Sequence, residues 1–317
     1  MKYLNEYSDG SRLSGIYLCK SKITATTKNG RTYYNLIVQD KTGTMDAKIW
    51  DVDSGAIEEF EAMDYIDVVG EVSRYNGSLQ LTIRRLRIPS ENEYDRNDYQ
   101  PSSRYSLDSM YENLMKYADM VENRYYSGLL KAFFGSGTEF EKRFKNASAA
   151  KNIHHGFIGG LLEHTLGVVR LCHIYTKAYS FLDRDLLITA AILHDIGKLD
   201  ELSAFPENDY TDEGQLIGHI TIGTEMIHDA CSGIEGFPKE LEIQLKHCIL
   251  SHHGELEYGS PKKPALAEAV ALSLADLTDA RMESFREALD SNAGNDEWFG
   301  FNRIFESNIR RTRQTDN

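Results

Sequence analysis

Residues 193 to 198 read Leu193-His194-Asp195-Ile196-Gly197-Lys198, a stretch that joins an imidazole directly to a carboxylate. His194 shares one helical face with three apolar residues that precede it by three, four and seven positions, namely Ala191, Ala190 and Leu187. Gly197 is a natural stop for that helix, because glycine readily adopts the backbone conformation of helix ends. We therefore expect His194 and Asp195 at the inner end of a buried helix.

Four more residues with metal-binding side chains lie on the apolar faces of other predicted helices: His164, His219, His252 and Asp276. A buried carboxylate without a partner costs on the order of several kcal/mol, so such groups pair with one another or bind a metal ion. The six groups together therefore predict a buried cation site on five helices. Imidazole and carboxylate ligands without thiolates suit Mn²⁺, Fe²⁺ or Zn²⁺.

The remaining histidines and the cysteines have simpler explanations. A single histidine on an apolar face is more often a hydrogen-bonded core residue than a ligand, and we assign that role to His173, His228 and His247. The four cysteines are scattered and form no C-x-x-C pair. We expect them to be small buried apolar side chains rather than zinc ligands or disulfides.

A chain of 317 residues usually forms two domains, and the sequence pattern changes near residue 90. Residues 1–90 contain five predicted strands, at 14–23, 32–40, 45–50, 65–73 and 79–88, with a short helix at 53–60 and a hairpin turn at Asn76-Gly77. Five strands with a helix between the third and the fourth predict a small Greek-key barrel of the OB type.

Beyond the barrel, residues 91–105 are polar and lack periodicity, which predicts a linker. Residues 106–317 carry helical patterns, so the predicted fold class is multi-domain, with an all-β OB-type barrel followed by an all-α domain. The candidate ligands concentrate at about 155–285. The segment 296–317, with Arg303, Arg310, Arg311 and Arg313, is either a basic tail or a frayed helix.

Composition narrows the classes of function. Hydrophobic residues make up 41% of the chain, enough for a buried core, and no stretch approaches the ~20 apolar residues of a membrane span. The first residues are polar, which argues against a signal peptide and favours a cytoplasmic protein. The net charge is −14, yet residues 1–90 hold 12 Lys and Arg against 12 Asp and Glu. The acidity therefore lies beyond the barrel, among the candidate ligands.

The ordered motifs resemble those of a known superfamily. They are Gly159-Gly160-Leu161-Leu162-Glu163-His164-Thr165, Leu193-His194-Asp195-Ile196-Gly197-Lys198, Gly218-His219, Ser251-His252-His253-Gly254 and Ala275-Asp276. The pattern H…HD…H…HH…D is similar to the extended, two-metal form of the HD-domain phosphohydrolase superfamily. With an OB-like barrel before it, the chain resembles the YhaM-type 3′–5′ exoribonucleases over both domains.

This resemblance implies two divalent cations, with Mn²⁺ favoured, that activate water and stabilise the leaving oxygen. One cation would be held by His164, His194, Asp195 and Asp276. The second would be held by the other oxygen of Asp195, with His219 and His252.

Four further residues are candidate contacts to substrate. Lys198 either contacts the phosphate or is a solvated lysine at a helix end. His253 points about 100° away from His252 if both lie on a helix, so we expect it to support the ligands or to touch substrate. His154 and His155 precede the first ligand helix and either touch substrate or belong to a loop.

The predicted barrel has its own candidate ligand, because OB barrels bind single strands through aromatic stacking and scattered basic groups. The candidate contacts are Tyr33, Tyr34, Lys48, Trp50, Arg74, Tyr75, Arg84 and Arg85. Adjacent Tyr33 and Tyr34 point to opposite faces of a strand, so only one of them meets a ligand. Aromatic residues that face inward belong to the core instead.

These features together predict a metal-dependent phosphodiesterase that acts on single-stranded RNA, with single-stranded DNA as a second candidate substrate. The resemblance implies that it is a 3′–5′ exonuclease that releases nucleoside 5′-monophosphates. An HD-type nucleotidase or cyclic-dinucleotide phosphodiesterase is an alternative, although a small substrate needs no strand-binding barrel. A non-catalytic single-strand binding protein is the other alternative, against which the complete ligand set argues. The prediction includes no membrane partner, and a homo-oligomer is compatible with it.

Overall fold

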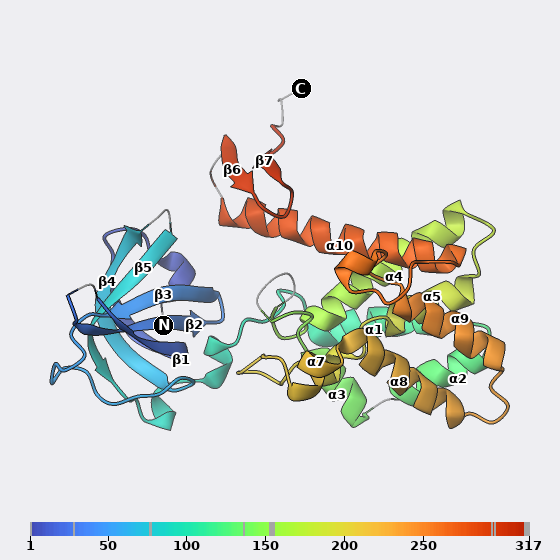
Figure 1. Cartoon of the computed structure of the whole chain (residues 1–317), viewed down its shortest axis with the longest axis horizontal. Coiled ribbons are helices and arrows are strands. Elements are labelled where there is room, and N and C mark those ends of the chain that lie inside the picture. Colours follow the sequence, from blue (N-terminus) through green and yellow to red (C-terminus); the bar gives the residue numbers. More distant parts are fainter. Residues whose placement is uncertain are drawn as a thin grey trace. The chain divides into compact units, whose positions relative to one another are not determined.

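The computed structural model describes residues 2–27, 29–75, 78–135, 137–151, 156–292, 294 and 296–313. It contains two compact units (Figure 1). The first consists of Met1–Ser102 together with the short segment Ala204–Asn208. The second consists of Ser103–Ser203 and Asp209–Asn317.

The first unit is a closed five-stranded barrel in the order β1-β2-β3-β5-β4. Its strands are β1 (Arg12–Thr26), β2 (Thr32–Asp40), β3 (Gly43–Ile49), β4 (Tyr65–Tyr75) and β5 (Ser78–Arg87). Neighbouring strands are antiparallel except for the parallel pair β3 and β5. The long strand β1 closes the barrel, because its first half pairs with β4 and its second half with β2. The predicted five-stranded barrel is confirmed.

Alternating side chains fill the barrel. On β5, Leu81, Ile83 and Leu86 are buried, while Arg84 and Arg85 between them face solvent. Two apolar residues outside the strands, Ile57 and Phe60, also pack onto this core. Truncating a buried leucine or isoleucine to alanine typically costs about 2–5 kcal/mol, so this alternation is enough to specify which face of each strand points inward.

The helix predicted at 53–60 is wrong. The segment consists of turns and extended chain, with Ile57 bridged to Leu86 on β5. Ile57 and Phe60 have helical spacing, but Asp51, Ser54 and Gly55 favour turns, and the apolar pair reaches the core without a helix. The predicted hairpin turn at Asn76-Gly77 lies outside the described residues, although its flanking residues Tyr75 and Ser78 pair as expected.

Residues 91–102, predicted as part of a linker, lie against the barrel within the first unit. They include two short 3₁₀ helices, η2 (Glu91–Glu93) and η3 (Arg96–Tyr99). A separate 3₁₀ helix, η1 (Leu4–Glu6), lies near the start of the chain. Tyr94 stacks on Tyr65, and the side chain of Gln39 donates a hydrogen bond to the carbonyl of Tyr99.

The second unit is built from helices that surround one apolar core. Its helices are α1 (Leu107–Ala118), α2 (Arg124–Phe133), α3 (Glu139–Asn146), α4 (Gly160–Ala178), α5 (Arg184–Leu193), α6 (Lys198–Glu201), α7 (Asp212–Leu216), α8 (His219–Ser232), α9 (Lys239–Leu250), the 3₁₀ helix η4 (Leu256–Tyr258) and α10 (Ala267–Ser291). Helix α4 packs against α5 and α10, while α9 packs against α5 and α8. Every residue of α5 from Leu186 to Leu193 is buried, which makes α5 the centre of the unit.

Over its described residues, 296–313, the C-terminal segment is not the predicted basic tail or frayed helix. Figure 1 shows a two-stranded hairpin at the C-terminal end of α10, formed by β6 (Trp298–Asn302) and β7 (Ser307–Arg310). Its turn is closed by the side chain of Asn302, which accepts hydrogen bonds from the backbone of Ile304 and Phe305. The aromatic residues of β6, Trp298, Phe299 and Phe301, favour a strand, and the arginines nearby do not prevent it.

None of the helices in the described ranges is long and apolar enough to cross a bilayer. All four cysteines, Cys19, Cys172, Cys231 and Cys248, are buried and unpaired, which confirms that they are core residues rather than disulfides.

Candidate metal centre

Asp195 lies at the centre of the site, in the turn between α5 and α6. Helix α5 ends at Leu193, so His194 and Asp195 follow directly from its buried end, as predicted. Gly197 allows α8 to approach this turn, because a Cβ at position 197 would overlap with the backbone oxygen of His219. The prediction that Gly197 ends the helix is wrong, because α5 ends at Leu193 and Gly197 directly precedes α6. Its role is to bring the first residue of α8 next to Asp195.

The two carboxylate oxygens of Asp195 face different pairs of imidazoles. Oδ2 lies 3.5 Å from Nε2 of His164 and 3.4 Å from Nε2 of His194. Oδ1 lies 3.5 Å from Nε2 of His219 and 3.6 Å from Nε2 of His252. Asp195 is thus placed between two half-sites, each with its own pair of histidines.

Asp276 on α10 completes the half-site that contains His164 and His194. Its Oδ1 lies 3.1 Å from Nε2 of His164. Burial opposes the charged form of His164, but hydrogen bonds to Asp276 and Asp279 outweigh it and raise the pKa of this imidazole to about 10. The position that attracts a proton on Nε2 is also one where a cation would be stabilised.

In each half-site, a carboxylate accepts a hydrogen bond from Nδ1 of one of the two histidines. Nδ1 of His164 donates to Oδ2 of Asp279 at 2.7 Å, and Nδ1 of His219 donates to Oε1 of Glu201 at 2.9 Å. Burial alone would raise the pKa of Glu201, but its hydrogen bonds to His219 lower it, so the carboxylate is ionised and can only accept. Both histidines therefore carry a proton on Nδ1 and direct Nε2 toward Asp195.

Backbone carbonyls hold the other two histidines in the same way. Nδ1 of His194 donates to the carbonyl of Ala191 at 2.8 Å, and Nδ1 of His252 donates to the carbonyl of Ile249 at 2.7 Å. A carbonyl oxygen can only accept, so it selects the tautomer that leaves Nε2 free to act as a ligand. In all four histidines Nδ1 is hydrogen-bonded to a protein oxygen and Nε2 is directed toward Asp195, which is the usual arrangement of metal-binding imidazoles.

Buried polar atoms without a partner show that the residues fit a cation. Among the described residues, Oδ1 of Asp195, Nε2 of His219 and Nε2 of His252 are buried and have no hydrogen-bond partner. A buried polar atom left unpaired costs about 1–3 kcal/mol, so three converging on one point need an explanation. A divalent cation between them would satisfy all three, and the nitrogen and oxygen donors suit Mn²⁺, Fe²⁺ or Zn²⁺.

Lys198, the first residue of α6, also contacts Asp195. Its Nζ lies 2.8 Å from Oδ2 of Asp195, and its side chain is only 16% exposed, which excludes the alternative of a solvated lysine at a helix end. Burial alone would raise the pKa of Asp195, but the Lys198 ammonium and the surrounding imidazoles hold it well below its usual range. Both groups are therefore charged at neutral pH.

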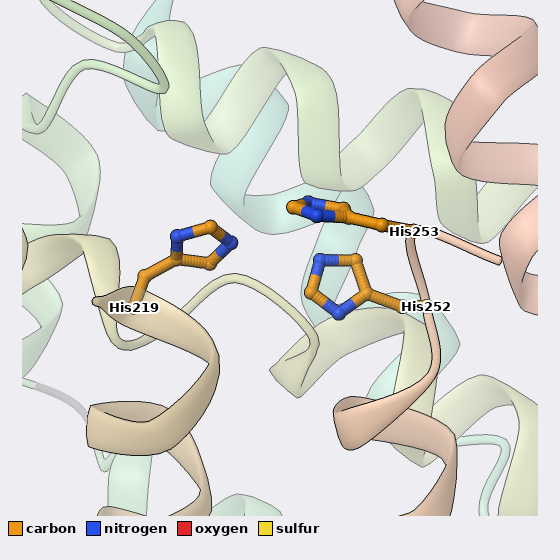
Figure 2. Close-up of side chains that lie close together, drawn as sticks. All are labelled: His219, His252 and His253. Carbon is orange, nitrogen blue, oxygen red and sulfur yellow. The ribbon is translucent and has the colours of Figure 1, made fainter. Parts of the chain in front are cut away.

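His253 lies beside His252 rather than pointing away from it. Their ring centroids are 4.2 Å apart, and the His219 ring is 5.2 Å from His253 (Figure 2). The helical direction that we predicted does not apply, because α9 ends at Leu250 and both histidines lie in the following turn. Burial, and then the charge of His252, lower the pKa of His253 to about 4, so this imidazole is neutral near pH 7.

A cavity of about 580 Å³ opens onto this centre. Its polar lining consists of His164, Lys198, His253, Tyr258, Ser273 and Asp276, and its apolar lining of Ala149, Ala150, Leu277 and Ala280. Ligand sites usually occupy about 300–1,000 Å³, so the cavity suits one nucleotide-sized group. The predicted contacts His154 and His155 lie outside the described residues.

Several residues of this centre were missed by the sequence analysis. Asp279 is three residues after Asp276 on the same helical face, and that spacing could have identified it. Glu201 is the last residue of α6, and Tyr258 and Ser273 are polar residues outside the recognised motifs. No local sequence pattern therefore marked these three residues as part of the centre.

The barrel brings three of its predicted nucleic-acid contacts together. Tyr33 stacks on Trp50 with ring centroids 4.8 Å apart, and Nζ of Lys48 lies 5.2 Å and 5.1 Å from the two ring centroids. Trp50 is 46% exposed, so the cluster is accessible. Tyr34 instead packs edge-on against Phe60 of the core, which confirms that the adjacent tyrosines face opposite sides.

The other predicted contacts are dispersed over the barrel surface and do not join this cluster. Arg74 and Tyr75 lie at the end of β4, and Arg84 and Arg85 lie on the outer face of β5. Arg84 is 3.9 Å from Glu71, an exposed ion pair.

Comparison with known proteins finds relatives for both units. Residues 161–281 match the family described as HD domain, and residues 19–89 match the family described as OB-fold nucleic acid binding domain. The 3′-5′ exoribonuclease YhaM of Geobacillus sp. (strain WCH70) is 34% identical over 290 residues, covering 91% of this chain and 88% of the relative.

Solved structures of OB-fold and single-stranded DNA binding proteins resemble part of the chain. The second OB-fold domain of replication protein A from Methanococcus maripaludis has a TM-score of 0.22 at 18% identity, covering 28% of this chain and 95% of that one. The mitochondrial single-stranded DNA binding protein Rim1 of S. cerevisiae has a TM-score of 0.20 at 12% identity, covering 26% and 98%. Such low TM-scores support no functional conclusion.

Proposed function

The chain belongs to the YhaM family of 3′-5′ exoribonucleases, and on this premise we propose that it is a metal-dependent nuclease that shortens single-stranded RNA from the 3′ end. Single-stranded DNA is the second candidate substrate. The observation that carries the proposal is the buried Asp195 carboxylate, with each oxygen facing two imidazoles whose Nε2 atoms point toward it. We assign strand capture to residues 1–90 and hydrolysis to residues 106–317, with the centre within about 155–285.

Two divalent cations are proposed, with Mn²⁺ first and Fe²⁺ or Zn²⁺ as alternatives. His164, His194, Asp195 and Asp276 would hold one cation, and Asp195, His219 and His252 the other. When bound, such a pair supplies Lewis-acid activation of water and stabilises the leaving oxygen.

The chain's own residues bind and orient the phosphodiester. Lys198 and His253 both line the cavity beside the ligands. The Lys198 ammonium is held by Asp195 and can donate to a phosphate oxygen, which offsets the charge that develops during hydrolysis. His253 is neutral near pH 7, and its Nδ1 donates a hydrogen bond to the carbonyl of Tyr258 at 2.8 Å, which leaves Nε2 to accept a hydrogen bond from a sugar hydroxyl of the substrate.

The reaction is an ordinary hydrolysis. Water adds to the last phosphodiester of the strand, and the bond from phosphorus to the 3′-oxygen of the preceding nucleotide breaks. One nucleoside 5′-monophosphate leaves, and the shortened strand again ends in a 3′-hydroxyl. The proton lost by water returns to the leaving 3′-oxygen.

Polarity can be tested with a 5′-labelled single-stranded RNA in Mn²⁺. We expect a ladder that shortens one nucleotide at a time, with nucleoside 5′-monophosphates as the released product. A 3′-phosphate should slow degradation strongly, because the cavity is sized for one terminal nucleotide. Early internal fragments, or products that carry 3′-phosphates, would contradict the assignment.

Strand capture by the barrel can be tested with tryptophan fluorescence, because the chain has two tryptophans, Trp50 and Trp298. In a Trp298→Phe variant, Trp50 is the remaining tryptophan. Adding single-stranded RNA in the presence of EDTA should quench its emission, since a base stacks on the exposed Tyr33–Trp50 cluster. Trp50→Ala should weaken binding by about 1–3 kcal/mol, the usual contribution of one stacked base.

Matched controls separate stacking from general effects. Ile23→Ala removes another exposed apolar side chain, on β1, and should leave RNA affinity unchanged. Double-stranded RNA should not quench Trp50, because its bases are already stacked. Unchanged RNA affinity in Trp50→Ala, with no quenching in Trp298→Phe, would remove this cluster from the proposed binding surface.

A further inference from the structure

We propose that Glu201 and Asp279 are paired positioning residues, each of which holds one ligand histidine of one half-site and so sets the affinity of that half-site for its cation. This inference rests on the proposed metal-dependent function. It assigns roles to two carboxylates that face away from the cavity side of the histidines and have no direct place in the hydrolysis.

Asp279 contacts Nδ1 of His164, the ring nitrogen that does not face Asp276. Helix α10 presents Asp276 and Asp279 three residues apart, so one carboxylate faces Nε2 of His164 at 3.1 Å and the other faces Nδ1 at 2.7 Å. Gly167 on α4 makes room for this arrangement, because a Cβ at position 167 would overlap with the carboxylate of Asp279. The fold thus contains a slot between α4 and α10 that is filled by the Asp279 side chain.

Glu201 acts on His219 in a related way. Its Oε1 accepts a hydrogen bond from Nδ1 of His219 at 2.9 Å and another from the backbone nitrogen of His219 at 3.0 Å. The N-cap residue of α8, Gly218, has no side chain to cap the helix, and the Glu201 carboxylate takes that place. One group therefore orients both the imidazole and the helix from which it projects.

The contrast within each half-site strengthens the assignment. His194 and His252 are held by neutral backbone carbonyls, whereas His164 and His219 are held by carboxylates. A carboxylate makes the imidazole a stronger donor to a cation, and loss of such a partner typically weakens metal affinity about 10–100-fold. Each half-site has one carboxylate partner of this kind. Removing Asp279 should therefore weaken the affinity for one cation, and removing Glu201 should weaken the affinity for the other.

The test is a Mn²⁺ titration of the full-length chain by calorimetry, with hydrolysis of labelled RNA measured beside it. In Asp279→Ala and Glu201→Ala we expect one Mn²⁺ to bind as in the wild type and the other about 10–100-fold more weakly. Asp279→Asn and Glu201→Gln should lose less, since an amide oxygen still accepts from Nδ1 although the charge is gone. Gly167→Ala should weaken Mn²⁺ binding as Asp279→Ala does, because the added Cβ would overlap with the Asp279 carboxylate.

Double variants identify which half-site each carboxylate serves. If Glu201 acts through His219, adding Glu201→Ala to His219→Ala should change Mn²⁺ binding no further, whereas adding Asp279→Ala should produce its full loss. Asp200→Asn and Asp290→Asn are matched controls on α6 and α10, because these exposed carboxylates pair with Arg143 and Arg286 away from the histidines. Both controls should bind Mn²⁺ as the wild type does.

The outcomes distinguish this inference from the proposed function. If the wild type binds Mn²⁺ and hydrolyses RNA, but the alanine variants bind Mn²⁺ equally well, the positioning role is overturned and the function stands. If either amide variant loses both ions and melts early, the residue has a structural role only, which also overturns the inference. If the wild type binds no Mn²⁺ and hydrolyses RNA in EDTA, the proposed function itself fails.

Discussion

Asp195→Asn is expected to reduce RNA hydrolysis by about 1,000-fold or more while RNA binding stays close to that of the wild type. The reason is that Asp195 is placed between both half-sites, with Oδ2 facing His164 and His194 and Oδ1 facing His219 and His252. Removing one well-placed electrostatic group from an active site commonly costs about 100–1,000-fold, and this residue serves two half-sites at once. The measurement is the initial rate on 5′-labelled RNA with saturating Mn²⁺.

The control for this variant is stability, because Lys198 loses its closest carboxylate. Removing one partner of a buried ion pair can cost about 3–5 kcal/mol, although Lys198 keeps the nearby charges of Asp276 and Glu201. Circular dichroism and a thermal melt should show a folded protein at the assay temperature. Activity near that of the wild type in folded Asp195→Asn, or in wild type after exhaustive chelation, would contradict metal-dependent hydrolysis at this centre.

His219→Ala and His252→Ala are expected to leave one ion bound per chain and to lose most of the hydrolysis rate. The buried Nε2 atoms of both histidines converge on Oδ1 of Asp195 within 3.6 Å, so each variant removes one donor from the same half-site. A cation with too few ligands is bound weakly, so excess Mn²⁺ should restore part of the rate. The measurements are metal content per chain by elemental analysis and initial rates.

Two other histidines provide the comparison. His253→Ala should keep both ions and chiefly raise KM for RNA, because His253 lines the cavity and its Nδ1 is held by Tyr258. His228→Ala should change neither quantity, since His228 is half exposed and pairs with Glu242 outside the centre. Two ions retained in His219→Ala and His252→Ala, with near-normal rates, would show that these histidines are only core residues.

Local patterns in the sequence were sufficient for the main elements of both units. The alternation around Leu81 and Ile83 predicted a strand with one buried face, and the apolar faces beside His164 and Asp276 predicted buried helices. Such patterns are local, because the side chains of a strand or helix repeat with a period that neighbouring residues reveal. The candidate ligands were therefore predicted from spacing, supported by the resemblance to HD-domain proteins.

Predictions at the ends of elements were weaker, because an element ends where local and tertiary interactions compete. Helix α9 stops at Leu250, which places His252 and His253 in a turn and brings both rings into the centre. The apolar residues Ile57 and Phe60 have helical spacing, yet they reach the barrel core from turns. The aromatic residues of β6 form a hairpin at a place where the arginines suggested a tail.

The sequence alone thus predicted which imidazoles and carboxylates lie together, since such groups on apolar faces have to be paired when the chain folds. Only the tertiary structure decided how they are held. Glu201 and Asp279 became partners of His219 and His164 because Gly197 and Gly167 let helices approach closely enough for those side chains to meet. Contacts of this kind depend on how distant segments pack, and no local period in the sequence encodes them.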